Sequence, residues 1–466
     1  MYTTIRRIHL IGIGGTGMSG IAEVLLNQGY DVSGSDLKQT KITQMLESLG
    51  GKVFYEHDAR NLTGAQVVVI SSAIRPDNPE LKAARAKSIP VISRAEMLAE
   101  LMRQKYGIAI AGAHGKTTTT SMIASVLTHG YLAPTIVIGG RLRSSNRNAK
   151  LGTGQFFVAE ADESDGSFLR LSPTIAVITT IDEEHLDYFK TLEKVKDAFV
   201  EFANKVPFYG AAVVCTDDPN VRSILPRITR RVITYGLEKD ADVSALAINQ
   251  KGMNVCYKAF SKGELIGEIE LRMPGRHNVY NSLAAVAVGL ELRVEFEAVK
   301  TALAEFQGVE RRFEVKGECA GVIVVDDYGH HPTEIRAVLE TARGIWKGKL
   351  VAVFQPHRFT RTALLSRQFG EAFDSCDCVY LTDIYAAGEE PIKGISSKTI
   401  ATEIEKRGKA RVVYQPDLKL LLAELGAGLA PGDVVATLGA GDISRFGESL
   451  LEALRARKES VGCKRT

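Results

Sequence analysis

The sequence predicts an α/β protein with parallel sheets, arranged as three domains, and three observations support this fold class. Short apolar runs alternate with glycine-bearing turns and amphipathic stretches of about 10 to 15 residues, which is typical of parallel sheets covered by helices. The pattern restarts twice, near residues 105 and 309. A length of 466 residues also favours about three domains.

Each unit begins with a predicted strand, and ligands of open parallel sheets bind beyond the carboxyl ends of strands. Each restart therefore indicates one place where a functional site is expected. The strands and helices that mark the units are predicted at residues 8–12, 67–71 and 94–103, then 108–112 and 281–292, then 322–326, 350–354, 379–382 and 434–438. We expect domains at residues 1–104, 105–308 and 309–466.

Composition excludes several classes of protein. Lys and Arg number 58 and Asp and Glu number 55, and the formal net charge of +3 does not suggest a protein that wraps nucleic acid or binds a membrane surface. No apolar run approaches the ~20 residues needed to cross a bilayer. The six cysteines are scattered, with only Cys376 and Cys378 close together, as in a reduced cytoplasmic protein without a disulfide framework or zinc site.

A glycine fingerprint follows the first strand. Residues 12–17 read Gly-Ile-Gly-Gly-Thr-Gly before a predicted helix, and Asp36 closes the next strand. Glycines let the backbone approach a pyrophosphate and an acid takes a ribose hydroxyl, so the motif indicates a Rossmann-like domain that binds NAD, FAD or a nucleotide sugar. The alternative for the glycine motif is a purely structural tight turn. The alternative for Arg94 is a solvated arginine at the start of a helix. The candidate ligand contacts are Gly14, Gly15, Gly17, Asp36, Ser71 and Arg94.

A second glycine loop follows the strand at residues 108–112 and leads with Gly-Lys-Thr into a helix. In such a loop the amides surround phosphate oxygens, the lysine reaches the terminal phosphates and the hydroxyl binds Mg²⁺. The spacing is G-x-x-G-K-T-T, shorter than the common pattern, whose first glycine would fall at Ile110. The loop predicts a nucleoside triphosphate site, with His114 interpreted as a loop residue rather than a catalyst. Its residues are Gly112, Ala113, His114, Gly115, Lys116, Thr117 and Thr118.

Two acidic clusters follow later apolar runs, at residues 160–165 and 182–187. A triphosphate repels a carboxylate substrate, so hard cations are needed between them, and carboxylate oxygens with a histidine suit Mg²⁺. Solvated acidic loops are the alternative for either cluster alone. Two clusters at strand ends of the sheet that carries the phosphate loop favour a metal site.

Further motifs follow in the same chain. They begin at Pro274 (Pro-Gly-Arg-His-Asn-Val-Tyr-Asn), Gly308 (Gly-Val-Glu-Arg-Arg-Phe-Glu), Asp326 (Asp-Asp-Tyr-Gly-His-His-Pro) and Gln355 (Gln-Pro-His-Arg-Phe-Thr-Arg-Thr). With both glycine loops and both acidic clusters, they resemble the Mur ligase family over essentially the whole chain. The family commonly has Gly-Thr-His-Gly-Lys where this chain has Ala113, which is a mild change.

The resemblance implies an ATP-dependent ligase that joins L-alanine to the lactyl carboxylate of UDP-N-acetylmuramate through an acyl phosphate. It implies a Rossmann-like domain for the UDP-sugar rather than NAD, a central P-loop ATPase-like domain, and a C-terminal Rossmann-like domain for the amino acid. A cytoplasmic monomer or weak homodimer without nucleic-acid or membrane partners is expected. The alternatives are a sister ligase that attaches a preformed murein peptide, a nicotinamide-dependent dehydrogenase, and a phosphate-loop switch protein without ligase activity.

The resemblance also implies roles for single residues. By themselves, His277 and Asn281 could equally be polar residues at a helix start, and a single arginine or histidine of the third domain could be a surface or structural residue. Lys116 and Thr117 would hold ATP and Mg²⁺, with Glu160 and His185 as further metal ligands. The adenine would contact His277 and Asn281, and the nucleotide would also contact Arg312 and Asp327. The incoming amino acid and the transferred phosphate would meet Tyr328, His330, Arg358 and Arg361. Sister ligases carry a modified lysine downstream of the metal histidine, and the sequence assigns that role to neither Lys194 nor Lys196.

Overall fold

The computed structural model describes residues 4–143 and 147–462. The chain divides into two compact units. The first comprises Met1–Ile248, Cys256–Arg272 and Asn278–Gly308, and the second comprises Asn249–Val255, Met273–His277 and Val309–Thr466. Two of the three sheets lie mainly in the first unit, and the third lies in the second unit.

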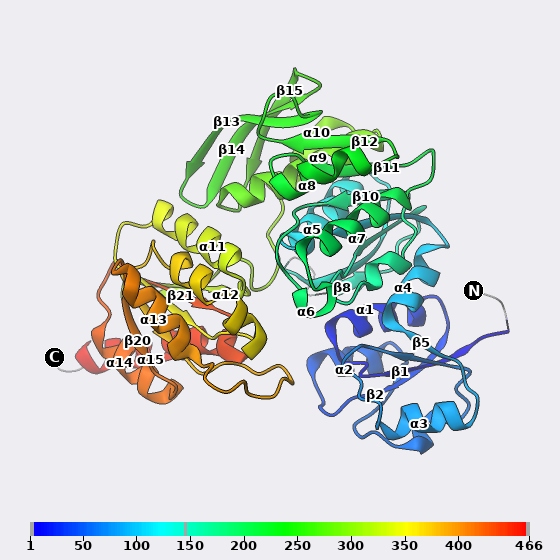
Figure 1. Ribbon diagram of the computed structural model, residues 1–466, viewed down its shortest axis with the longest axis horizontal. Helices are drawn as coiled ribbons and strands as arrows, with labels where there is room; N and C mark the ends of the chain where they lie inside the picture. The colour runs from blue at the N-terminus through cyan, green and yellow to red at the C-terminus, as the bar shows by residue number, and fades with distance from the viewer. Residues whose placement is uncertain (1–3, 144–146, 463–466) are drawn as a thin grey trace. The chain divides into compact units, whose positions relative to one another are not determined.

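The N-terminal sheet has five parallel strands in the order β3-β2-β1-β4-β5 (Figure 1). Strands β1 and β4 and helix α4 confirm the elements predicted at residues 8–12, 67–71 and 94–103. The strands are β1 (Arg7–Ile11), β2 (Asp31–Ser35), β3 (Lys52–Phe54), β4 (Val67–Ile70) and β5 (Val91–Ser93). The helices are α1 (Thr16–Asn27), α2 (Lys41–Ser48), α3 (Pro79–Ala86) and α4 (Arg94–Met102), with a short 3₁₀ turn η1 (Ala59–Leu62).

The central sheet has ten strands in the order β15-β14-β13-β12-β11-β10-β6-β9-β7-β8. Strand β6 begins the predicted phosphate loop and lies between β10 and β9, which pair with it in parallel. The acidic clusters follow β9 and β10, so both lie at the edge of the sheet where the phosphate loop lies. The strands are β6 (Tyr106–Ala111), β7 (Thr135–Leu142), β8 (Arg147–Lys150), β9 (Phe156–Glu160), β10 (Ile175–Ile178), β11 (Ala211–Cys215), β12 (Val232–Gly236), β13 (Val243–Lys251), β14 (Asn254–Ser261) and β15 (Glu264–Leu271).

The helices connected to this sheet differ from the prediction at one point. Helix α9 begins at Arg276, directly after Pro274 and Gly275, whereas the sequence predicted a helix from residue 281. The first turn of α9 carries polar side chains, whereas the predicted helix was marked by the small residues that follow, so the first turn was not predicted as helix. The helices are α5 (Lys116–His129), α6 (Leu186–Phe189), α7 (Leu192–Asn204), α8 (Pro219–Ile224), α9 (Arg276–Glu291) and α10 (Phe296–Ala304), with 3₁₀ turns η2 (Ser167–Arg170) and η3 (Leu225–Arg227).

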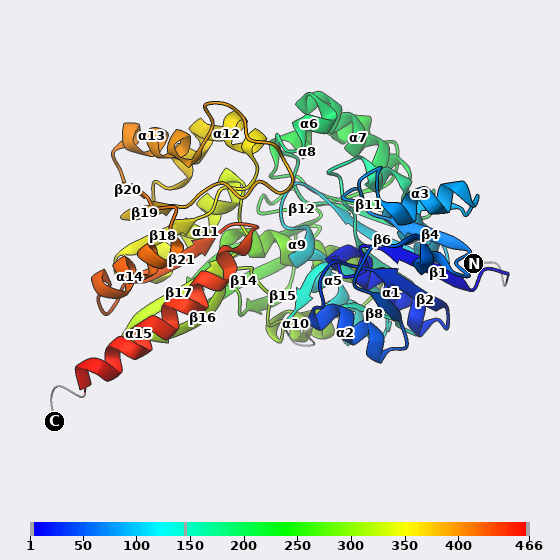
Figure 2. The ribbon, with the colours of Figure 1, turned by 90° about the horizontal axis from the view of Figure 1, so that it is seen from below.

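The C-terminal sheet has six strands in the order β16-β17-β21-β18-β19-β20, and only its edge strand β16 runs antiparallel to its neighbour. Helices α12 and α13 pack on one face of the sheet, and α14 and α15 pack on the other (Figure 2). All four strands predicted in this part are confirmed. The strands are β16 (Glu314–Cys319), β17 (Val322–Asp327), β18 (Leu350–Phe354), β19 (Cys378–Leu381), β20 (Arg411–Tyr414) and β21 (Val434–Leu438). The helices are α11 (Pro332–Ile345), α12 (Phe359–Ala372), α13 (Ser397–Arg407), α14 (Leu418–Gly428) and α15 (Phe446–Gly462), with a 3₁₀ turn η4 (Asp442–Arg445).

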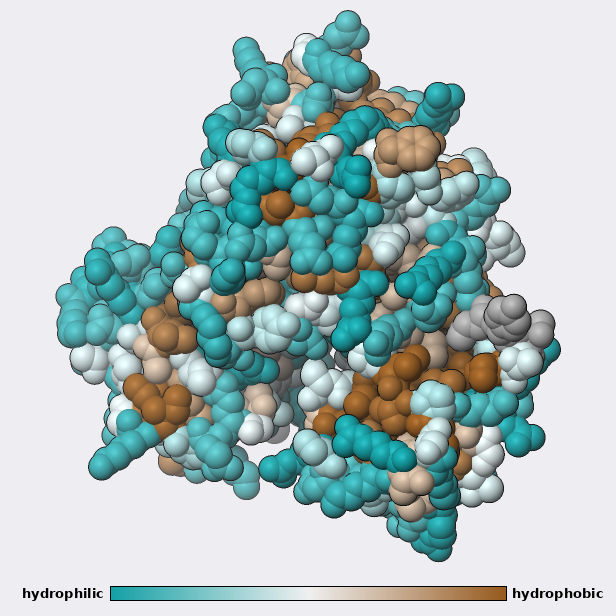
Figure 3. Space-filling model, turned by 45° about the vertical axis from the view of Figure 1, so that its right-hand side comes forward, coloured by the Kyte–Doolittle hydropathy of each residue, from teal (hydrophilic) through white to brown (hydrophobic). Residues whose placement is uncertain are grey.

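The surface carries mixed side chains. Figure 3 shows hydrophilic side chains over most of the displayed face, with hydrophobic side chains gathered in smaller areas between them. Across residues 4–143 and 147–462, no helix combines the length and the apolar character that crossing a bilayer requires.

Candidate active site

The phosphate loop connects β6 to α5 through two glycines with positive φ. Gly112 has φ +139° and Gly115 has φ +80°. A Cβ atom on Gly112 would lie 2.0 Å from Oγ1 of Thr179, and one on Gly115 would lie 2.5 Å from Oδ1 of Asn281. The turn therefore needs glycine at both positions for its backbone conformation and for its close approach to β10 and α9.

Residues after β10 hold the loop in place. The amide of Ala113 donates to the carbonyl of Thr180 at 2.9 Å, and the amide of His114 donates to Oγ1 of Thr180 at 3.0 Å. Nε2 of His114 lies 2.9 Å from Oδ2 of Asp182, in the second acidic cluster. His114 thus joins the loop to that cluster, and no local sequence pattern indicates these partners.

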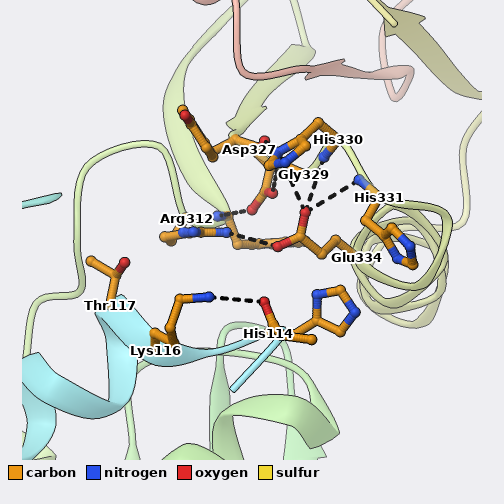
Figure 4. A network of polar contacts seen from close by, with 12 residues as sticks. His114, Lys116, Thr117, Arg312, Asp327, Gly329, His330, His331 and Glu334 are labelled. Carbon is orange, nitrogen blue, oxygen red and sulfur yellow. Dashed lines mark hydrogen bonds and ion pairs between the residues drawn. The ribbon is translucent and has the colours of Figure 1, made fainter. Parts of the chain in front are cut away.

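Lys116 turns back over the loop that precedes it (Figure 4). Its ammonium group donates to the carbonyl of Gly112 at 2.6 Å, the carbonyl of Ala113 at 3.2 Å and Oε1 of Glu163 at 2.7 Å. Burial opposes its charge, but Glu163 and two other nearby carboxylates raise the pKa of Lys116 above its usual value. Lys116 is therefore a permanent cation at the position where a loop of this kind receives terminal phosphates.

Glu160 ends β9 beside the start of α5. Its Oε2 accepts hydrogen bonds from Oγ1 of Thr117 at 2.9 Å and from the amide of Gly139 at 3.0 Å. A hydroxyl and a carboxylate on neighbouring elements form a set of oxygen atoms that suits a hard divalent cation.

A second group of possible metal ligands consists of Glu163, Glu184 and His185, which each offer one atom within 4.8 Å of the others. Nε2 of His185 lies 3.6 Å from Oε1 of Glu163 and 3.7 Å from Oε2 of Glu184. Burial lowers the pKa of His185, but the hydrogen bond to Glu163 and the charges of both carboxylates raise it overall. Oε2 of Glu163 is buried and has no hydrogen-bond partner among the described residues. This unsatisfied oxygen beside a histidine fits a cation ligand.

The glycine fingerprint in the N-terminal sheet is held by the end of β2. The carbonyl of Ser35 accepts from the amide of Gly12 at 2.8 Å, and Oδ2 of Asp36 accepts from the amide of Gly14 at 2.9 Å. Oδ1 of Asp36 accepts from the next amide along the chain at 2.8 Å. Asp36 therefore holds the glycine loop with one carboxylate oxygen and its own chain turn with the other.

Arg94, at the start of α4, lies against the same loop. A Cβ atom on Gly17 would lie 3.0 Å from its Nη1, and its Nη2 donates to Oδ2 of Asp162 at 2.8 Å. Ser71 follows β4, which pairs directly with β1 in the same sheet. The structure thus brings Gly14, Gly17, Asp36 and Arg94 together.

In the second unit, two carboxylates organise the segment after β17 (Figure 4). Asp327 accepts from the amides of Phe313 and Gly329, both at 2.7 Å, and burial raises its pKa to about 6 although Arg312 opposes this shift. Glu334 accepts from the amide of His330 at 3.1 Å and from Nη1 of Arg312 at 3.4 Å. Glu334 is a site residue that was not predicted, although its place in the first turn of α11 is a helix-capping signal.

The remaining candidates of this unit gather around His357, a residue of the motif at 355–362 for which no role was predicted. The rings of His330 and His357 have centroids 5.5 Å apart, and the Tyr328 ring lies edge-on to His330 at 5.3 Å. Arg361 donates to Nδ1 of His357 at 3.2 Å. Burial, together with His330, Arg361 and Arg358, lowers the pKa of His357 to about 3, so it is neutral near pH 7.

Arg358 precedes α12 with a positive φ of +72°, and its buried Nε has no hydrogen-bond partner in the described ranges. A strained residue with an unsatisfied donor is a candidate ligand contact.

His277, like His357, is neutral near pH 7, because burial and then the charge of Arg312 lower its pKa to about 4. Lys194 and Lys196 form ion pairs with acidic neighbours on α7.

Three family models match most of the chain. "Mur ligase family, catalytic domain" matches residues 7–106, "Mur ligase middle domain" matches residues 110–289, and "Mur ligase, glutamate ligase domain" matches residues 311–441.

Relatives match over nearly the full length. The UDP-N-acetylmuramate–L-alanine ligase of Geobacter sp. (strain M21) is 56% identical over 461 residues, which cover 99% of this chain and 100% of that protein. The crystal structure of the UDP-N-acetylmuramate–alanine ligase of Thermotoga maritima matches with a TM-score of 0.80 at 31% identity, over 97% of this chain and 99% of that one. The murein peptide ligase of Psychrobacter arcticus shares the fold, with a TM-score of 0.73 at 21% identity, over 96% and 98% of the two chains. The full-length matches and the three family models agree, and the chain belongs to the Mur ligase family.

Proposed function

We propose that this chain is an ATP-dependent ligase that joins L-alanine to the lactyl carboxylate of UDP-N-acetylmuramate in peptidoglycan precursor synthesis. The observation that carries the proposal is the phosphate loop, whose Lys116 and Thr117 contact the carboxylates of Glu163 and Glu160. The relatives that match over the full chain at 53–56% identity bear the name of this activity, which supports the choice of substrates.

We propose three domains with separate tasks, at residues 1–104, 105–308 and 309–466. The first would bind the UDP-sugar at the glycine loop, using Gly14, Gly15, Gly17, Asp36, Ser71 and Arg94. The second would bind ATP with residues 112–118 and Asn281, joined by His277, Arg312 and Asp327. The third would receive L-alanine near Tyr328, His330, Arg358 and Arg361.

A carboxylate reacts poorly with an amine because its oxygen is a poor leaving group. Phosphorylation makes that oxygen part of a phosphate group, which is a better leaving group. The lactyl carboxylate attacks the γ-phosphorus of ATP, which forms an acyl phosphate and releases ADP. The amine of L-alanine then attacks the acyl carbon, and phosphate leaves from the tetrahedral intermediate with the original carboxylate oxygen. The amine loses its protons during this step, and an amide remains.

This chain's residues contribute positioning and charge rather than a covalent step. Lys116 stabilises negative charge on the phosphoryl group during transfer. Thr117, Glu160 and His185 would hold Mg²⁺, which neutralises repulsion between triphosphate and carboxylate. Arg358, with its unsatisfied Nε, would bind an anionic group of the amino acid or the phosphate.

We propose that the enzyme acts in the cytoplasm, where ATP is available, as a monomer or weak homodimer without nucleic-acid or membrane partners. The sister activity, attachment of a preformed murein peptide, is the alternative that shares this fold and chemistry. ADP release measured with UDP-N-acetylmuramate and each of L-alanine, glycine, L-serine and the murein tripeptide separates the two. The proposal predicts preference for L-alanine and a product of matching mass; turnover with the tripeptide alone would contradict it.

A further inference from the structure

The ion pair between Arg94 and Asp162 connects the two proposed nucleotide sites of the first unit. Nη2 of Arg94 donates to Oδ2 of Asp162 at 2.8 Å. The same side chain lies close to Gly17, where a Cβ atom would be 3.0 Å from Nη1 and 3.2 Å from Cδ. A larger residue at position 17 would press on Arg94, so this one side chain lies against the glycine fingerprint and contacts the first acidic cluster.

Asp162 determines the course of the segment that carries the carboxylates. Its Oδ1 accepts from the amide of Ser164 at 3.1 Å, and its carbonyl accepts from the amide of Phe168 at 3.0 Å and from Oγ of Ser167 at 3.2 Å. Two glutamates of the same segment contact residues of the phosphate loop: Glu160 accepts from Thr117, and Glu163 accepts from Lys116. A shift of Asp162 therefore displaces two carboxylates that contact the phosphate loop.

The pair is not placed to contribute much to stability. The Arg94 and Asp162 side chains keep 23% and 41% of their surface exposed, and ion pairs of this exposure contribute little to folding. Arginine has five N–H donors in a planar fork, so Arg94 can hold Asp162 with Nη2 and present Nη1 and Nε to an anion at the glycine loop. Neither Nη1 nor Nε donates a hydrogen bond within the part of the chain that the structure describes.

We propose that Arg94 and Asp162 are positioning residues that couple the two nucleotide sites, so that UDP-sugar bound at the glycine loop increases affinity for Mg²⁺·ATP. The inference rests on the proposed function. A diphosphate at the glycine loop fixes the guanidinium, the guanidinium fixes Asp162, and Asp162 orients Glu160 and Glu163 toward the phosphate loop. Because binding linkage is reciprocal, Mg²⁺·ATP must increase affinity for the UDP-sugar by the same factor.

The test measures this factor by calorimetric titration of the full chain without L-alanine, so that no amide forms. Mg²⁺·AMP-PNP is titrated with and without saturating UDP-N-acetylmuramate, and the reverse titration provides the reciprocal value. We expect the wild-type protein to show at least about 5-fold tighter binding of each ligand in the presence of the other.

Asp162→Asn is the decisive variant, because asparagine keeps the acceptor for Ser164 and removes the charge that holds Arg94. In this variant we expect each ligand to change the affinity for the other by less than about 2-fold. UDP-N-acetylmuramate alone should bind nearly as it does to the wild-type protein. Arg94→Lys keeps a charge but loses the fork, and it should lose the coupling as well as some affinity for the UDP-sugar. The double variant should lose no more coupling than either single variant, because both act through one contact.

Arg170→Gln is the matched control. Nη1 of Arg170 forms a parallel ion pair with Oε1 of Glu96 at 2.9 Å, between the same two segments but without contact to the glycine loop. We expect this variant to keep the wild-type factor. Equal loss of coupling in Arg170→Gln, or full coupling in Asp162→Asn with native circular dichroism, would overturn the inference. Wild-type protein that binds both ligands independently would overturn the inference alone, whereas failure to bind UDP-N-acetylmuramate at all would also overturn the proposed function.

Discussion

The ammonium group of Lys116 lies 2.7 Å from Oε1 of Glu163, and this contact joins the phosphate loop to the first acidic cluster. The two residues are 47 positions apart in the sequence, and the direct parallel pairing of β6 with β9 brings them together. The carboxylate keeps the lysine charged and holds it over the loop carbonyls. The same ammonium group can therefore meet a terminal phosphate without first gaining a proton.

Lys116→Ala should lower kcat by at least about 100-fold, because the variant loses the charge that stabilises phosphoryl transfer. Binding of UDP-N-acetylmuramate should remain nearly unchanged, since its proposed site is in the N-terminal sheet. Steady-state ADP release and calorimetric titration measure the two quantities. Lys194→Ala removes an exposed lysine of α7 and serves as the control with unchanged turnover. Undiminished product formation by Lys116→Ala would show that the reaction takes place elsewhere.

Gly115→Ala should impair nucleotide binding. The substitution places a Cβ atom 2.5 Å from Oδ1 of Asn281 and forces alanine to φ +80°. We expect the KM for ATP to rise by more than about tenfold, because a displacement of the loop removes several amide contacts to phosphate together. Gly50→Ala is the matched control: its φ is +93°, but a Cβ atom there has no neighbour within 4 Å. Gly50→Ala should cost about 1–2 kcal/mol of stability from strain and leave the KM for ATP unchanged. Similar ATP kinetics in both variants would contradict the steric explanation.

Glu160→Ala and His185→Ala should each lower activity severely and raise the Mg²⁺ concentration required for half-maximal rate. Glu160 ends β9 and His185 follows β10, the two strands on either side of β6 and its phosphate loop, and both residues are proposed to hold cations there. Their losses should be far from additive, because residues that act on one phosphoryl transfer fail together. Rates measured across a Mg²⁺ titration, with the double variant included, test this expectation. Full activity of both variants at low Mg²⁺ would refute the metal assignment while leaving the reaction itself intact.

Glu80 should make the stability of the N-terminal sheet depend on pH. It is fully buried, accepts hydrogen bonds from Ser35 at 2.6 Å and Asn61 at 2.8 Å, and contacts His9 and His57. Burial raises the pKa of Glu80, but these hydrogen bonds, that of His9 foremost, lower it below the usual 4.5. The unfolded chain therefore binds the proton more tightly than the folded chain, and the stabilisation from Glu80 is present at neutral pH and lost as pH falls through the folded-state pKa, below 4.5.

We therefore expect Glu80→Gln to cost about 1–3 kcal/mol at pH 7, because buried donors lose a charged acceptor. The difference from the wild-type protein should shrink as the pH is lowered below 4.5. Hydrogen exchange of β1 and β2 amides at neutral and acidic pH measures the local opening free energy. A difference that grows toward acidic pH would contradict the assignment of a charged Glu80.

The elements that the sequence predicted have strong local signals. Strands such as β4, β18 and β21 are apolar runs because parallel strands are buried on both faces, and both glycine loops mark a strand that turns into a helix. Strands β13 to β15 gave no such signal, since β13 and β15 carry exposed polar residues over much of their length. The early start of α9 was missed for a similar reason, because polar residues occupy its first turn.

The contacts of the site were harder to predict than its loops. The sequence identified Lys116 and the acidic clusters, but the pairing of Lys116 with Glu163 depends on β6 and β9 being neighbours in the sheet. The partnership of His114 with Thr180 and the central place of His357 among Tyr328, His330 and Arg361 likewise come from tertiary packing. Local patterns indicate which residue types carry the chemistry, whereas packing decides which of them touch.

The fate of the carboxylate oxygen shows whether the reaction passes through an acyl phosphate. UDP-N-acetylmuramate labelled with ¹⁸O in its lactyl carboxylate is incubated with ATP, Mg²⁺, L-alanine and the protein, and the released phosphate is analysed by mass spectrometry. The account predicts that one labelled oxygen appears in each phosphate released, in step with formation of the L-alanine amide. Amide formation with unlabelled phosphate, or phosphate release that ignores the UDP-sugar and L-alanine, would contradict it.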